Sequence, residues 1–274
     1  MDSGGMTRNP RTVTVVSRIL GTAAWGLLIL LGACCDVHGA WVAEGRYGPF
    51  VCRAEFPLAE IEPLLTQLPH IQAGLMEALE IPASRETIEL YLFRGKASYD
   101  QHLARNLPKV AYRRALYVKD KGPGRVYAYR GPHFDVDVRH EVTHALLHGA
   151  LPVVPLWLDE GLAVYFENPP EKRIFDSPQW ESVRWAVRLG GVRRLENLEK
   201  KRRAEDMDRG DYRFAWAWVH FLLHGPPAAR EELVRFVGDI QAGRPIGLLS
   251  ERLRVRMGDP SQLLLSHVRS WSRP

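Results

Sequence analysis

Two histidines and a glutamate stand close together near the middle of the chain, in the run HEVTH at positions 140–144. Residues four apart on an α-helix differ by about 400° in rotation, so His140 and His144 would share one face and could bind one metal ion. Glu141 would lie about 60° from His144, which lets its carboxylate reach a water molecule on that ion. The spacing therefore predicts metal binding and proton abstraction from five consecutive residues.

The residues around this motif predict a helix with one buried face. Apolar side chains recur at positions 138, 142, 145 and 146, which is helical spacing, whereas the histidines and Glu141 lie off that stripe. His148 continues the histidine face, but it lies about 12 Å along the helix from His140, so His140, His144 and His148 cannot all bind one ion. We expect His148 to support the site or the fold. A pair of His144 and His148 would lack a following glutamate to act as base.

A third ligand is expected in the run LWLDEGLA at positions 156–163. Fifteen residues separate His144 from Glu160, which is enough chain to bring a second helix beside the first. Two histidines and one carboxylate would leave one position of a tetrahedral zinc site open for water. Hydrophobic spacing does not choose between Asp159 and Glu160. The carboxylate that is not a ligand would be exposed or would hold a ligand histidine by its other nitrogen.

These two runs together resemble the signature of gluzincin metallopeptidases, HExxH followed by W-L-x-E-G-x-A. The second run also resembles the LWLNEGFA stretch of the alanyl aminopeptidase family. The resemblance covers roughly residues 139–166 and implies Zn²⁺ as cofactor, with His140, His144 and Glu160 as ligands and Glu141 as general base. The ligands by themselves would also accept cobalt or manganese.

The chain departs from the aminopeptidases in two respects. They place about three more residues between the two runs, and they carry a GAMEN-like segment that has no counterpart here. Exopeptidase activity is therefore not implied. The sequence is more similar to compact bacterial peptidase-MA-like proteins, and this resemblance implies a zincin-like fold and a peptide or protein substrate of unknown identity.

Metal-assisted hydrolysis of a peptide bond also needs a hydrogen-bond donor for the negative charge that develops on the carbonyl oxygen. Tyr212, which opens a predicted helix rich in aromatic residues, is our candidate. Arg213 and His220 in the same segment are alternatives, as are Tyr127 and Tyr129 on the last predicted strand. Aromatic residues at helical spacing more often belong to a core. In related folds the last strand edges the cleft, where an extended peptide could add as a further strand.

The amino terminus has the pattern of a targeting segment. Basic residues up to Arg18 are followed by the uncharged run 19–33 and then by Cys34. Such a run of about 15 apolar residues is short for a membrane span and typical of a signal peptide. The residues LGAC at 31–34 resemble a bacterial lipobox, which implies lipidation of Cys34. We expect residues 1–33 to export the protein to the cell envelope as a lipoprotein signal, as a plain signal peptide cut near Ala40, or as an uncleaved membrane anchor.

The pattern of residues 41–274 predicts one domain of the α+β class, which the resemblance implies to be zincin-like. The part from 41 to 132 is expected to form a small mixed sheet with helices, and the part from 133 to 274 to be all-helical and to begin with the HExxH helix. Strands are expected at 47–56, 87–93, 115–119 and 125–130, with a hairpin turn at 121–124. Helices are expected at 58–79, 97–107, 136–148, 156–167, 178–189, 211–224, 227–241, 246–256 and 260–271. Gly149, Gly190 and Gly225 are expected as helix C-caps.

Composition limits the partners of this chain. Hydrophobic residues make up 46% and charged residues 25%, which is ordinary globular composition. The net charge of +5 falls to about +3 without the first 33 residues, which is too small an excess to predict nucleic-acid binding. Three cysteines without a CxxC pair disfavour thiolate zinc sites and a disulfide framework. The basic residues at 193–194 and 200–203 are interpreted as a solvated connector.

The alternative function is that of a non-catalytic, metal-binding interaction protein on the same fold, anchored to the membrane.

Overall fold

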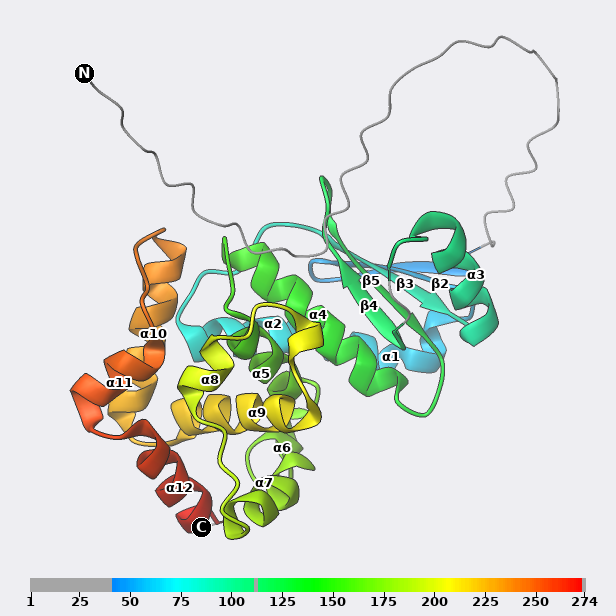
Figure 1. The fold of residues 1–274 in the computed structure, drawn as a ribbon. Coiled ribbons are helices and arrows are strands. Elements are labelled where there is room, and N and C mark those ends of the chain that lie inside the picture. The colour runs from blue at the N-terminus through cyan, green and yellow to red at the C-terminus, as the bar shows by residue number, and fades with distance from the viewer. Residues whose placement is uncertain (1–40, 111–112, 273–274) are drawn as a thin grey trace, which may run out of the picture.

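The computed structural model describes residues 41–110 and 113–272 (Figure 1). The predicted targeting segment and Cys34 lie outside these residues. Within them, none of the helices combines the length and the apolar character needed to cross a membrane.

Five strands form one mixed sheet in the order β1-β2-β3-β5-β4. They are β1 (Ala43–Tyr47), β2 (Phe50–Ala54), β3 (Ile88–Phe93), β4 (Ala115–Val118) and β5 (Gly124–Tyr129). The three central strands are parallel, whereas β1 and β4 pair antiparallel at the two edges. The prediction of a single strand over 47–56 is wrong, because Gly48 adopts a φ of +60° and turns the chain between β1 and β2.

Helices cover both faces of this sheet, and every element described after β5 is a helix. The first half contains η1 (Leu58–Ile61), α1 (Glu62–Leu65), α2 (Leu68–Leu79) and α3 (Lys96–Asn106). The second half contains α4 (Phe134–Ala150), α5 (Leu156–Phe166), α6 (Pro170–Arg173), α7 (Gln179–Arg188), α8 (Leu195–Glu199), η2 (Ala204–Asp206), α9 (Arg209–His224), α10 (Pro227–Gln241), α11 (Leu249–Met257) and α12 (Pro260–Ser270). The seven helices predicted for this half are confirmed. The predictions missed α6, α8 and η2, and Gly149 is not a C-cap because α4 continues to Ala150.

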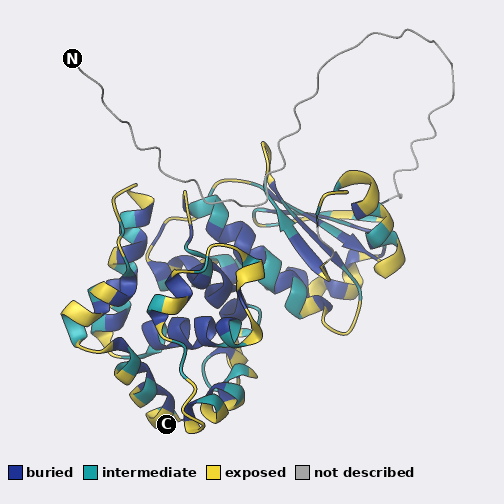
Figure 2. Ribbon diagram, viewed as in Figure 1, coloured by how far each residue is buried: buried dark blue, intermediate teal, exposed yellow. Residues whose placement is uncertain are grey.

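Helix α4, which carries the HExxH run, lies between the sheet and α5 (Figure 1). Its predicted apolar stripe, Val138, Val142, Ala145 and Leu146, is at most 2% exposed and belongs to a core shared with the sheet. Helix α3 covers the opposite face of the sheet through a smaller aromatic cluster. The other flank of α4 faces α5, which is buried along its length, as Figure 2 shows in dark blue at the centre of the helical part.

Helices α5 and α9 cross in close contact at Gly161. A Cβ atom added there would lie 2.6 Å from the carbonyl oxygen of Ala215 and 2.8 Å from Val219 Cγ2. Both distances are too short for carbon, so α9 can approach α5 only where α5 has no side chain. Since Glu160 precedes Gly161, this contact also fixes the part of α5 that faces α4.

Replacement of Gly161 by alanine is expected to lower the stability of the fold. Overpacking in a filled core costs about 1–3 kcal/mol, which for a domain of this size lowers Tm by about 2–4 °C per kcal/mol. Thermal unfolding followed by circular dichroism measures the effect. The control is Gly238→Ala in α10, where the added Cβ meets nothing within 4 Å and a gain of about 0.4–1 kcal/mol is expected. Equal stability of the two variants would contradict the packing argument.

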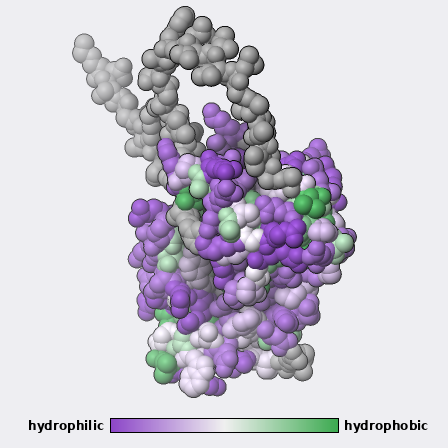
Figure 3. Space-filling model, turned by 90° about the vertical axis from the view of Figure 1, so that its right-hand side faces the viewer, coloured by the Kyte–Doolittle hydropathy of each residue, from purple (hydrophilic) through white to green (hydrophobic). Residues whose placement is uncertain are grey.

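The outer surface is mainly polar. Figure 3 shows that hydrophilic side chains dominate the face turned to the viewer, with hydrophobic ones scattered among them. The exposed large hydrophobic residues of the described chain are Val42, Val153, Trp185, Leu189 and Val255. The large apolar side chains of the described residues therefore lie mainly in the core.

Candidate metal centre

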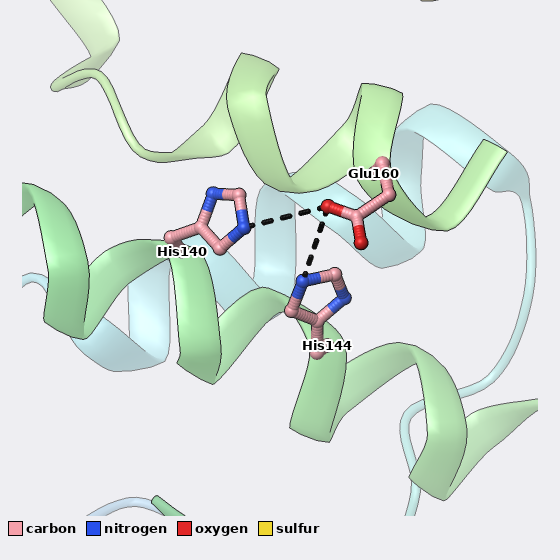
Figure 4. A group of neighbouring side chains, drawn as sticks. All are labelled: His140, His144 and Glu160. Carbon is pink, nitrogen blue, oxygen red and sulfur yellow. Dashed lines mark ion pairs between the residues drawn. The ribbon is translucent and has the colours of Figure 1, made fainter. Parts of the chain in front are cut away.

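The side chains of His140, His144 and Glu160 converge between α4 and α5 (Figure 4). Glu160 Oε2 lies 3.6 Å from His140 Nε2 and 3.7 Å from His144 Nε2. Ligand atoms around one tetrahedral zinc ion are separated by roughly 3.3 Å, given bonds of about 2.0–2.2 Å. The three groups therefore have the spacing and the chemistry of a His₂Glu site, and Glu160 rather than Asp159 faces the two Nε2 atoms.

The other nitrogen of each histidine meets a second carboxylate. His144 Nδ1 lies 2.7 Å from Asp159 Oδ1, and His140 Nδ1 lies 2.9 Å from Glu167 Oε2. A carboxylate in this position accepts the Nδ1 proton, so that the Nε2 lone pair is directed towards the metal position. This was predicted as one of two roles for Asp159. Glu167 was missed, although it lies seven residues after Glu160 and thus on the same face of the helix.

These carboxylates raise the pKa values of both histidines. Burial alone would lower the pKa of His140, but the carboxylate of Glu160 beside Nε2 and that of Glu167, which accepts a hydrogen bond from Nδ1, raise it well above 6.5. For His144, burial is likewise outweighed by Asp159 and Glu160, and the pKa rises to about 9. The protein without metal therefore carries protons at neutral pH on nitrogens that a metal ion needs free.

Zinc binding is accordingly expected to strengthen as pH rises from 6.5 towards 9. A raised histidine pKa stabilises the metal-free fold below pH 6.5, and this stabilisation is lost as pH rises through the folded value. The affinity for the metal rises over the same pH range, by up to about tenfold per pH unit for each proton that binding releases. The rise in Tm on zinc addition should therefore be larger at pH 8.5 than at pH 6.5. An equal or smaller rise at pH 8.5 would show that these protons do not compete with the metal.

Glu141 and Tyr212 both lie beside this centre. Glu141 follows His140 on α4, is partly exposed, and adds to the negative charge that raises the pKa of His140. Tyr212 lies in the first turn of α9 and is half-buried. Burial, followed by the charge of Glu160, raises the pKa of Tyr212 to about 12, and Glu141 adds to this rise. The Tyr212 hydroxyl is thus a proton-bearing donor close enough to Glu160 and Glu141 for their charges to act on it.

Three of the alternative oxyanion donors, His220, Tyr127 and Tyr129, lie in other surroundings. His220 is fully buried, with Nδ1 3.0 Å from His267 Nε2 and Nε2 2.9 Å from the carbonyl oxygen of Ile174. Tyr127 belongs to the aromatic cluster on the α3 side of the sheet, and Tyr129 packs against the same cluster. The idea that these tyrosines face a cleft beside α4 is therefore wrong, since their strand turns them to the opposite face.

His148 contacts the centre indirectly, through Asp159. Its Nε2 lies 2.9 Å from Asp159 Oδ2, while Asp159 Oδ1 meets His144. The atoms of His144, His148 and Asp159 are close enough to form a second candidate metal group. An ion there would need the same His144 Nδ1 whose proton binds Asp159, so the two groups compete for one imidazole. The arrangement favours hydrogen bonding by His148 and metal binding through His140, His144 and Glu160.

Comparison with known proteins gives little beyond this geometry. No protein-family model matches the chain, and no curated protein matches it. Among solved structures, the chain is similar to an M1 zinc metallopeptidase from Deinococcus radiodurans, with 17% sequence identity and a TM-score of 0.46. The match covers 85% of this chain and 52% of that enzyme, so the chain spans about half of its length.

Proposed function

We propose that the protein is a zinc-dependent peptide hydrolase of the gluzincin type on a zincin-like fold. The observation that carries the proposal is that Glu160 Oε2 lies 3.6 Å from His140 Nε2 and 3.7 Å from His144 Nε2, with Glu141 next to His140 on α4. A carboxylate behind each ligand histidine is the arrangement that metal sites use to fix imidazole orientation and basicity. The resemblance of the two sequence runs to gluzincins agrees with this chemistry.

The residues divide into binding and reacting groups. His140, His144 and Glu160 would hold a zinc ion, and such an ion lowers the pKa of a coordinated water towards about 7 and polarises a carbonyl group. Glu141 accepts the proton of the attacking water and delivers it to the amine that leaves. Tyr212 donates a hydrogen bond to the oxyanion that develops on the carbonyl oxygen. The substrate class is a peptide or protein, and endopeptidase action is proposed because no segment equivalent to the GAMEN run binds a free amino terminus.

The test of the metal site is the zinc content of the purified chain, measured by elemental analysis after reconstitution and dialysis. We expect about one zinc ion per chain, and loss or strong weakening of binding in His144→Ala and in Glu160→Ala. Matched controls are His70→Ala and Glu77→Ala, which remove an exposed histidine and an exposed glutamate on α2. Absence of zinc from the reconstituted parent, or its retention in both site variants, would refute the proposal.

We also propose export to the cell envelope with attachment to the membrane. This rests on the amino-acid pattern of residues 1–33 and on Cys34, which fit a lipoprotein signal, a plain signal peptide or an anchor. The mass of the mature chain distinguishes these cases, because lipidation at Cys34 adds acyl mass to a shortened chain. An unmodified chain that begins at Met1 and stays in the cytosol would contradict the proposal.

A further inference from the structure

Asp159 is held by two histidines on opposite sides. Its Oδ1 accepts from His144 Nδ1 at 2.7 Å and its Oδ2 accepts from His148 Nε2 at 2.9 Å. Asp159 is only 8% exposed, so water has little access to these hydrogen bonds. Asp159 is therefore a buried acceptor in which each carboxylate oxygen has its own histidine donor.

His148 is itself fixed from several directions. The ring of Tyr117, on the edge strand β4, lies 5.6 Å from the His148 ring between centroids. Lys119 Nζ, just after that strand, donates to the His148 carbonyl oxygen at 3.1 Å and pairs with Glu86. The position and tilt of His148 are thus set by β4 and its flank, and not only by the end of α4.

One side of His148 borders a cavity. The cavity has a volume of about 430 Å³ and is lined by Glu86, Lys119, His148 and residues 149–152. The His148 side chain is 21% exposed, so it does not fill the core. A substitution at this position therefore changes the hydrogen bond to Asp159 without opening a hole in the packed interior.

We propose that His148 is a positioning residue for the metal centre, acting through Asp159 on His144. Its Nε2–H fixes one oxygen of Asp159, which leaves the other oxygen directed at His144 Nδ1. This holds His144 in the tautomer and orientation that present Nε2 to the metal position. Without the His148 donor, Asp159 would keep an unpaired buried oxygen and could rotate away from His144. This inference rests on the proposed zinc site and goes beyond it by assigning a role to a residue that binds no metal.

The test compares zinc affinities of the full chain by competition with a chelator. In His148→Leu we expect affinity to fall about tenfold, the lower end of the range for loss of a supporting hydrogen bond. In His148→Gln, whose amide can place an N–H near the position of the imidazole Nε2, affinity should stay within about threefold of the parent. A merely structural role would be seen instead as equal loss in both variants with a lower Tm of the metal-free protein.

A double-mutant cycle tests the route through Asp159. Asp159→Asn alone should lower the zinc affinity about 10–100-fold. Adding His148→Leu should lower it little further, because both changes break the same connection from His148 through Asp159 to His144. Additive losses, or unchanged affinity in His148→Leu while the parent binds zinc, would overturn the inference and leave the proposed function intact. Two zinc ions in the parent, with one lost in His148→Leu, would make His148 a ligand and also overturn it. A parent that binds no zinc would remove the proposed function itself.

Discussion

Glu141→Gln is expected to reduce peptide hydrolysis by about 10²–10⁴-fold while zinc content stays at the parental level. Glutamine keeps the size of the side chain but cannot accept a proton from water. Glu141 is not among the three groups whose atoms converge on the metal position, so zinc should remain bound. The predicted loss corresponds to about 3–5 kcal/mol of transition-state stabilisation.

The measurement uses a peptide found by screening a peptide library with the parent protein, with cleavage followed by mass spectrometry. Glu181→Gln, an exposed glutamate on α7, is the control for an equal change of charge. Parental activity in Glu141→Gln would show that another group acts as the base. A parent that holds zinc but cleaves no member of the library would instead favour the alternative of a non-catalytic interaction protein on this fold.

The part of the site that lies within one helix could be predicted from the sequence. His140, Glu141 and His144 are related by helix geometry alone, and the apolar stripe of α4 fixes which way they face. The choice of Glu160 over Asp159 as the metal ligand depended on the family motif. Adjacent residues on a helix point about 100° apart, and both carboxylates reach the centre. Tertiary contacts, rather than periodicity, decide which carboxylate meets which nitrogen.

Features that depend on the crossing of two helices were not predictable in this way. Glu167 meets His140 only because α5 passes α4 at a particular angle and offset. The contact at Gly161 that sets α9 against α5 is of the same kind. The short helix α8 (Leu195–Glu199) was missed because five residues are too few to show a helical period, and the basic residues around it resemble a connector.

For the strands, too, local residues predicted the hairpin, whereas contacts between distant parts of the chain decide which face of each strand meets the site. The hairpin of β4 and β5 was predicted from the turn residues at 121–124 and is confirmed by their antiparallel pairing. The suggestion that Tyr127 or Tyr129 faces the cleft was wrong, since both lie on the α3 side of the sheet, whereas Tyr117 on β4 reaches His148. Alternation along a strand gives two faces, and only the packed structure shows which one meets the site.

Tyr212→Phe is expected to lower kcat by about 10²–10³-fold, with KM and zinc affinity close to parental values. The hydroxyl is the only group removed, and a donor that acts on the oxyanion contributes in the transition state and not in substrate binding. Its raised pKa, about 12, keeps the proton in place throughout the neutral range, as a hydrogen-bond donor requires. The capping box of Asp208 and Asp211 at the start of α9 holds the backbone at this position.

The matched control is Tyr165→Phe, which removes a hydroxyl that pairs with His224 Nε2 at 2.8 Å, twelve residues beyond Tyr212 on α9. We expect this variant to lose some stability through the broken hydrogen bond and to keep kcat within about twofold of the parent. A rise in KM without a change of kcat in Tyr212→Phe would place this hydroxyl on the substrate in its ground state. An unchanged kcat and KM would remove Tyr212 from the mechanism, and Arg213, the next residue on α9, would be the donor to test.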